Sequence, residues 1–237
     1  MDKVEIPEVV LNSGHKMPAI GLGTGGSPAP LAEQLPPLVE AIAAGYRHFD
    51  TAAEYGTEEI VGQAVAEALA RGLIKSRDEI FITTKLWCTD ADHDLVLPAL
   101  NESLRNLGRH GRVLSERVGQ VYCVSNYSCA KLSTLLENAT IPPAVNQVEL
   151  NVAWQQQKLM EFCKDKGIHV CAFSPLGAYG FRWGTNAVME SLILKDIAAA
   201  KDKTVAQIPQ QRACTGKEAV SPDGQYKSLE ELWDEKI

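Results

Sequence analysis

Gly45-Tyr-Arg-His-Phe-Asp50-Thr-Ala-Ala-Glu-Tyr55-Gly-Thr-Glu58, followed along the chain by Ile82-Thr-Thr-Lys85-Leu-Trp87, is the most informative part of the sequence. It places a carboxylate, a phenol and an ammonium after two successive apolar runs, at Asp50, Tyr55 and Lys85. A cation beside a phenol stabilises the phenolate and so makes the phenol a better proton donor near neutral pH. A neighbouring carboxylate keeps the ammonium charged and oriented. Such a trio suits the protonation of a carbonyl oxygen while a hydride reaches the carbonyl carbon.

The composition is that of an ordinary globular protein. The chain has 237 residues, of which 45% are hydrophobic and 22% charged, which is enough for a substantial core. The net charge is −7 and no basic run stands out, so nucleic acid is not an expected partner. No run approaches the ~20 apolar residues of a membrane span, and the start of the chain lacks the apolar segment of a signal peptide. We therefore expect a cytoplasmic protein with no membrane partner.

The cysteines and histidines show no spacing typical of a metal site. Five of the six cysteines lie in or beside apolar segments, and Cys214 lies in the tail. Reduced thiols packed in the interior are the preferred interpretation, with a disulfide framework as the alternative. None of the five histidines, His48 beside Phe49 included, is evidently placed to assist the trio.

Apolar runs alternate with segments of helical periodicity along the chain. A hairpin comes first, with its turn at Ser13-Gly14. The alternation argues for a parallel sheet with crossover helices, in one domain over residues 1–237. The predicted strands cover 20–24, 46–51, 80–86, 119–124, 144–150 and 168–173. The predicted helices cover 31–44, 59–71, 94–107, 129–139, 155–166 and 187–201, with a short C-terminal helix starting at the capping box Ser228 to Glu231.

About six βα units fall between a doubly wound sheet and a (β/α)8 barrel. In a barrel, functional side chains come from the carboxyl ends of several strands. Polar residues gather at those ends in this chain, which favours a barrel ancestry: Thr24, Asp50, Lys85, Ser125, Asn126, Gln147 and Ser174.

A second reading of the N-terminal glycines is a dinucleotide-binding Rossmann unit. Gly21-Leu-Gly23-Thr-Gly-Gly26 matches the GxGxxG pattern, and Asp50 follows at roughly the spacing of a ribose-binding acid. A Rossmann helix begins inside that motif, whereas Pro30 would here lie within its first turns. We prefer the interpretation in which Gly23 and Thr24 let a flat ring approach the backbone.

Each candidate residue taken singly also has a purely structural interpretation. Asp50 could cap a turn, Tyr55 could be half-buried packing, and Lys85 could be a solvated strand end. Their grouping at the ends of neighbouring strands favours the functional interpretation. The remaining candidates could likewise contact a ligand or simply occupy core or turn positions: Trp87, Ser125, Asn126, Gln147 and Phe173.

Taken together, the motifs resemble the aldo-keto reductase superfamily. The stretch from Gly45 to Glu58 is similar to that family's first signature. Val124-Ser-Asn-Tyr127 with Pro143-Ala-Val-Asn-Gln147-Val-Glu149 is similar to its middle segment, and Ser174-Pro-Leu-Gly177 to its cofactor loop. The tail from Val220 to Trp233 resembles the plant branch of codeinone-, chalcone- and deoxymugineic-acid-type reductases. The resemblance covers most of the chain and implies a (β/α)8 barrel that reduces an aldehyde or ketone to an alcohol with NADPH.

The resemblance also implies roles for single residues. Tyr55 would be the proton donor, Lys85 the residue that activates it, and Asp50 the partner of Lys85, while Trp87 would border a small-molecule carbonyl substrate. A monomer is the family default. The residues implied to contact NADP are Gly23, Thr24, Asp50, Ser125, Asn126, Gln147, Phe173, Ser174 and Leu176.

Two segments of the family pattern are missing. After Gly108 the family continues into a fourth strand that ends in a substrate-orienting His, whereas here residues 109–117 lead directly to the next strand. After Gln207 the family continues into an eighth strand and a loop that binds the 2′-phosphate of NADP. We therefore expect an incomplete barrel without strands 4 and 8, whose exposed edges would favour association. The alternative to a working reductase is a non-catalytic or poorly folded product with at most weak nucleotide binding.

Overall fold

The computed structural model describes residues 6–27, 29–108, 121–178 and 184–208, which form two units. The first unit holds residues up to 108 except 11–15, and the second holds 11–15 and the described residues from 121 onward. Each unit is described by itself. The connector at 109–117 and the predicted helix at Ser228 lie outside the described residues.

The first unit begins with the predicted hairpin, in which β1 (Glu8–Val10) pairs antiparallel with β2 (Lys16–Pro18). It continues as β3 (Leu22–Gly23), α1 (Leu31–Ala43), β4 (His48–Asp50), α2 (Glu58–Ala70), β5 (Phe81–Thr83) and α3 (Val96–Asn106). The strands form a parallel sheet in the order β3-β4-β5, with Gly23 opposite Asp50 and Asp50 opposite Thr83. Their carboxyl ends therefore lie at one edge.

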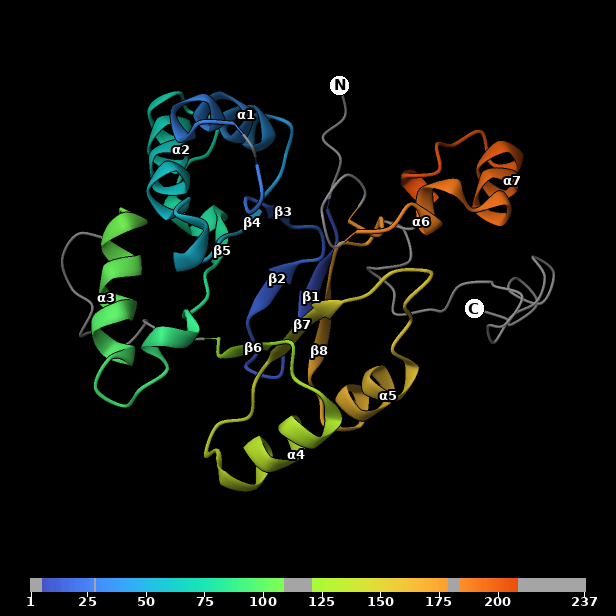
Figure 1. The fold of residues 1–237 in the computed structure, drawn as a ribbon. Helices are drawn as coiled ribbons and strands as arrows, with labels where there is room; N and C mark the ends of the chain where they lie inside the picture. Colours follow the sequence, from blue (N-terminus) through green and yellow to red (C-terminus); the bar gives the residue numbers. More distant parts are fainter. Residues whose placement is uncertain (1–5, 28, 109–120, 179–183, 209–237) are drawn as a thin grey trace. The chain divides into compact units, whose positions relative to one another are not determined.

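Helices α1 and α2 lie side by side in the first unit (Figure 1). Successive side chains of a strand point to opposite faces. In β4 this alternation sends Phe49, 1% exposed, into the core that the two helices share with the sheet. His48 and Asp50 point to the other face, where the candidate site lies. Helix α1 begins at Leu31, so no helix starts inside the glycine motif, and the Rossmann interpretation loses its support.

The second unit repeats the alternation. It contains β6 (Cys123–Ser125), α4 (Cys129–Asn138), β7 (Val145–Glu149), α5 (Gln157–Asp165) and β8 (His169–Phe173). These strands form a parallel sheet in the order β6-β7-β8, in which Ser125 pairs with Gln147. The segment predicted as one helix over 187–201 forms two helices, α6 (Ala187–Glu190) and α7 (Leu192–Ala200). The helix is interrupted because Ser191 adopts a non-helical backbone, at φ −57° and ψ 121°, and its hydroxyl caps α7.

Six strands pair in parallel in the described part of the chain, in two sheets of three. The expectation of an α/β fold with an incomplete barrel and an N-terminal hairpin is confirmed, while the single domain over residues 1–237 stays a prediction. No helix within the described ranges is long and apolar enough to cross a membrane.

Within the described ranges, the cysteines are not joined in disulfides. Cys163 is fully buried in the second unit, and burial raises the pKa of its thiol. Cys88 is exposed, so the interpretation of the cysteines as interior packing is wrong at this position.

Candidate active site

The structure brings Asp50, Tyr55 and Lys85 together at the carboxyl edge of the first sheet. The Lys85 ammonium forms an ion pair with the Asp50 carboxylate and donates a hydrogen bond of 3.0 Å to the carbonyl oxygen of Thr51. The Lys85 Nζ atom lies 5.0 Å from the centroid of the Tyr55 ring. The side chains of Lys85 and Asp50 are only 19% and 16% exposed, whereas Tyr55 is 40% exposed. A sheltered ion pair thus lies beside a phenol that a ligand can reach.

Local backbone structure explains why Tyr55 lies close to Lys85. Tyr55 ends a short 3-10 helix, Ala53–Tyr55, which Gly56 terminates in the left-handed region at φ 64°. The Ala53 N–H donates a hydrogen bond of 3.3 Å to the carbonyl oxygen of Lys85. The residues after β4 are therefore tied to the residues after β5.

Gly25 is a site residue that sequence reasoning missed. A Cβ atom added to Gly25 would lie 2.9 Å from Cε2 of Tyr55, so the phenol ring packs directly on this glycine. A Cβ at Gly23 would meet nothing within 4 Å, which leaves room beside Gly23 for a ligand. Glycine enrichment in residues 21–26 is the signal that could have found Gly25, but it does not say which glycine the ring covers.

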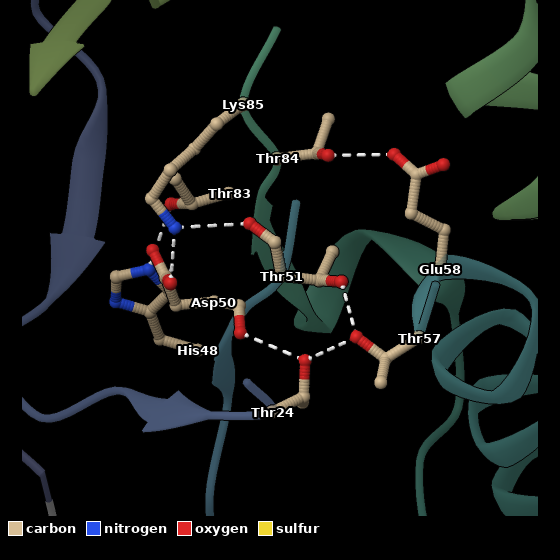
Figure 2. A network of polar contacts seen from close by, with 9 residues as sticks. All are labelled: Thr24, His48, Asp50, Thr51, Thr57, Glu58, Thr83, Thr84 and Lys85. Atoms are coloured by element: carbon tan, nitrogen blue, oxygen red, sulfur yellow. Dashed lines mark hydrogen bonds and ion pairs between the residues drawn. The ribbon is translucent and has the colours of Figure 1, made fainter. Parts of the chain in front are cut away.

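Thr24 lies at the edge expected for it, with its side chain turned into the protein. It is 7% exposed, and its hydroxyl donates a hydrogen bond of 3.1 Å to the carbonyl oxygen of Asp50. The Thr24 hydroxyl also lies 2.7 Å from that of Thr57, which lies 2.8 Å from that of Thr51 (Figure 2). The Thr24 hydroxyl is therefore engaged within the protein.

His48 lies closer to the trio than the sequence indicated. It is 3% exposed, with Nε2 2.9 Å from the Thr83 hydroxyl and Nδ1 3.3 Å from the carbonyl oxygen of Pro18. Because a carbonyl oxygen only accepts, Nδ1 carries the proton and Nε2 accepts from Thr83. Burial lowers the pKa of His48, while the carbonyl of Pro18 and the charge of Asp50 partly oppose this effect. The neutral ring therefore supports the strand that ends in Asp50.

The residues predicted to contact the cofactor in the second unit gather at the carboxyl edge of its sheet. Ser125 ends β6, Gln147 lies opposite it in β7, and Phe173 ends β8. The Asn126 N–H donates a hydrogen bond of 2.9 Å to the carbonyl oxygen of Gln147. Both Asn126 and Ser174 adopt left-handed backbone, at φ 60° and 50°. Such backbone strain is common where a loop is shaped for a ligand. Leu176, also predicted to contact the cofactor, lies in the same loop as Ser174.

Asn146 is a second residue that sequence reasoning missed. It is 0% exposed, and its amide Nδ2 donates a hydrogen bond of 2.9 Å to the carbonyl oxygen of Tyr127. Its Oδ1 accepts from the N–H of Tyr127 at 3.4 Å. This amide therefore holds the loop that contains Asn126. An asparagine inside a predicted strand was the available signal, but its partner Tyr127 is 19 residues away in the chain.

The chemistry of this second edge fits the nicotinamide part of a dinucleotide. A carboxamide needs both donors and acceptors, which the Ser125 hydroxyl and the amides of Asn126 and Gln147 can supply. The half-buried ring of Phe173 offers an aromatic face at the end of β8. Asp50, Tyr55 and Lys85 belong to the first unit, whereas these residues predicted to contact the nicotinamide belong to the second: Ser125, Asn126, Gln147 and Phe173.

Comparison with known proteins identifies the family. The Aldo/keto reductase family model matches residues 19–111 and 120–207, and the chain belongs to this family. It is 44% identical to Protein REDOX 2 of Catharanthus roseus, over 98% of both chains. It is 41% identical to deoxymugineic acid synthase 1-D of Triticum aestivum, over 93% of this chain and 97% of that protein. These relatives place it in the plant branch.

Solved structures agree with the family. A Bombyx mori aldo-keto reductase in complex with NADP aligns with a TM-score of 0.76 at 29% identity, covering 97% of this chain and 91% of that one. A second aldo-keto reductase, complexed with NADPH, aligns with a TM-score of 0.79, also at 29% identity, covering 90% of this chain and 77% of that one. The protein is therefore an NADP-dependent oxidoreductase of a family that acts on small carbonyl compounds.

The comparisons also show that this chain is shortened. Its alignment with Protein REDOX 2 runs over 317 positions, whereas the chain has 237 residues. The family match is interrupted between residues 111 and 120, where the sequence predicted the loss of the fourth strand, and it ends at residue 207, where the second loss was predicted.

Proposed function

We propose that this chain itself reduces an aldehyde or ketone to an alcohol with NADPH, and that Tyr55 is its proton donor. The observation that carries the proposal is the grouping of the Asp50–Lys85 ion pair with the exposed Tyr55 ring, 5.0 Å from Nζ of Lys85. A reactive phenol needs a nearby cation and access to its substrate, and this geometry provides both.

Each member of the trio then has a distinct task. Bound NADPH would supply a hydride from its nicotinamide to the carbonyl carbon. The Tyr55 hydroxyl would donate its proton to the carbonyl oxygen. The Lys85 ammonium would stabilise the phenolate that remains. The Asp50 carboxylate and the carbonyl oxygen of Thr51 would keep Nζ in place, as their contacts with Lys85 already do.

The cofactor would use the polar edge of the second sheet. Ser125, Asn126 and Gln147 would bind the carboxamide, and the Phe173 ring would stack on the nicotinamide. Ser174 and Leu176 would meet the pyrophosphate. In the first unit, Gly23, Thr24 and Asp50 would border the nicotinamide.

Trp87 would border the substrate. It lies two residues after Lys85 and is 42% exposed, and the neighbouring Leu86 is 43% exposed. Exposed apolar side chains that follow Lys85 in the chain suit the carbon skeleton of a small carbonyl compound. We propose a monomer as the working form.

A second candidate function is nucleotide binding without turnover. It is favoured by the interruption of the family match between residues 111 and 120. The resemblance implies that a substrate-orienting His is lost there. Under this hypothesis the second unit still contacts the nicotinamide, but carbonyl reduction is absent.

Absorbance of NADPH at 340 nm with a reactive aldehyde tests the mechanism. Tyr55→Phe should lower kcat by about 10²–10⁴-fold, the usual contribution of a general acid. Tyr122→Phe is a matched control, because Tyr122 is 41% exposed and belongs to the second unit. Equal turnover in Tyr55→Phe and the parent would refute the mechanism. NADPH binding in a fluorescence titration without any turnover would favour the second candidate.

A further inference from the structure

The N-terminus of α2 is the point where the polar ends of the three parallel strands β3, β4 and β5 meet. Thr57 directly precedes α2 and Glu58 is its first residue. Both are buried, at 3% and 4% exposed. Figure 2 shows that their side chains contact residues that follow each strand of the sheet. Neither residue has a role in the chemistry proposed above.

The Thr57 hydroxyl belongs to a directed chain of hydrogen bonds. Each threonine hydroxyl has one proton to donate. Thr24 donates its proton to the carbonyl oxygen of Asp50 at 3.1 Å, so Thr57 is the donor in its 2.7 Å contact with Thr24. Thr51 must then donate to Thr57 at 2.8 Å. The chain therefore runs from Thr51 through Thr57 and Thr24 to the backbone of Asp50.

Helix capping does not account for this arrangement. Thr57 occupies the N-cap position of α2, where a threonine hydroxyl usually accepts from an N–H of the first turn. Here the Thr57 side chain makes no capping hydrogen bond. Its hydroxyl serves the strand ends instead of the helix.

Glu58 ties the same point to the residues after β5. Its Oε1 accepts a hydrogen bond of 2.6 Å from the hydroxyl of Thr84, the residue before Lys85. Its Oε2 accepts a hydrogen bond of 3.1 Å from the side-chain amide of Asn106, at the end of α3. A carboxylate at a helix N-terminus is also favoured by the helix dipole.

Resting on the proposed function, we propose that Thr57 and Glu58 are positioning residues that set the distance between Tyr55 and the Asp50–Lys85 ion pair. Tyr55 lies two residues before Thr57 in the chain. Thr57 connects the segment that contains Tyr55 to the backbone of Asp50. Glu58, through its hydrogen bond with Thr84, connects the same segment to the backbone that leads to Lys85. Loss of either tie lets the proton donor and its cation drift apart while the nucleotide-binding edge of the second unit is unaffected.

Thr57→Val tests the proposal, because valine keeps the shape and removes the hydroxyl. We expect kcat to fall by about 10- to 100-fold, since a misplacement of 1 Å costs on the order of 10²-fold. The dissociation constant of NADPH should stay within about twofold. Thr57→Ser, which keeps the hydroxyl, should restore most of kcat. Thr134→Val is the matched control, because the Thr134 hydroxyl makes an exposed hydrogen bond within α4.

A second measurement does not depend on turnover. The rate at which an N-hydroxysuccinimide ester acylates Lys85, followed by peptide mass spectrometry, reports how firmly its amine is held. Thr57→Val should raise this rate severalfold relative to the exposed Lys75, and Thr57→Ser should not. Thr84→Val, which removes the donor to Glu58, should act in the same direction and serves if Thr57→Val does not fold.

The outcomes separate this proposal from the proposed function. A parent chain without Tyr55-dependent turnover would refute the proposed function, and the acylation rate of Lys85 would still decide the role of Thr57 and Glu58. An unchanged Lys85 rate in folded Thr57→Val or Thr84→Val would overturn the positioning role. A loss of kcat that Thr57→Ser does not restore would also overturn it.

Discussion

Replacing Gly25 with alanine should displace the Tyr55 ring without disturbing the core. The added Cβ would lie 2.9 Å from Cε2 and 3.0 Å from Cδ2 and Cζ of Tyr55, whereas ordinary contacts are 3.4–4 Å. The ring must therefore move by roughly 0.5–1 Å. Tyr55 is 40% exposed and can move toward solvent. The backbone of Gly25 is not left-handed, so alanine introduces no backbone strain at this position. We thus expect the free energy of unfolding to change by less than ~1 kcal/mol.

The effect on catalysis should be much larger than the effect on stability. A displacement of this size should lower kcat by about 10- to 100-fold. The dissociation constant of NADPH should change little, because neither Gly25 nor Tyr55 is among the residues proposed to bind the nucleotide. Stopped-flow or steady-state NADPH oxidation gives kcat, fluorescence titration gives the dissociation constant, and Tyr55→Phe defines the lower limit of activity.

Gly23→Ala provides the contrasting result. Its methyl would meet no protein atom within 4 Å, so any effect should appear in NADPH binding instead of in the position of Tyr55. Full kcat in Gly25→Ala would refute the reasoning, as would a loss that parallels weaker NADPH binding or a lower melting temperature. In either case the ring position seen beside Gly25 would not be the one that matters for proton transfer.

Further predictions concern both units. Asn146→Leu should leave the backbone of Tyr127 without its buried partner, lower the free energy of unfolding by about 1–3 kcal/mol and weaken NADPH binding; a titration that matches the parent would contradict the proposed role of this loop. Because burial lowers the pKa of His48, the unfolded chain takes up the proton first as the pH falls. Stability should therefore decrease below about pH 6.5, the ordinary pKa of histidine, and level off only below the lowered folded pKa. His48→Gln should reduce this slope in thermal melts, leaving the part due to His169, whose pKa is also lowered by burial; an unchanged slope would show that His48 is not the group responsible. Gly62→Ala would place a Cβ 2.7 Å from a backbone oxygen at the end of α3, and chemical denaturation should show a loss of about 1–3 kcal/mol; parent-like stability would mean that α2 and α3 do not pack this closely.

Local pattern was enough to predict most of the elements. Side chains repeat every 2 residues in a strand and every 3.6 residues in an α-helix, and the spacing of apolar residues shows these periods directly. Five of the six parallel strands and the helices before residue 187 lie at or near the predicted positions, although those strands are shorter than predicted. The strand predicted over 119–124 is displaced, because β6 covers Cys123–Ser125. The error at Ser191 has a local cause, because a serine inside an apolar helical pattern can instead end one helix and cap the next.

The missed site residues depend on contacts between distant segments. Thr24 and Thr57 are 33 positions apart, and Glu58 and Asn106 are 48 apart. Which hydroxyls meet depends on the register of the parallel strands and on how α2 enters the sheet edge. Threonines are common at strand ends, so their sequence positions alone do not indicate a network.

Short motifs and local periodicity were sufficient to identify the family, the alternation of strands and helices, and the trio of Asp50, Tyr55 and Lys85. Three features became visible only in the folded chain. The Tyr55 ring packs on Gly25, the Thr24 hydroxyl faces inward, and Thr57 and Glu58 connect the strand ends through hydrogen bonds. The reason is that a side chain's burial and hydrogen-bond partners are set by strand register and helix packing, which bring together residues far apart in the chain.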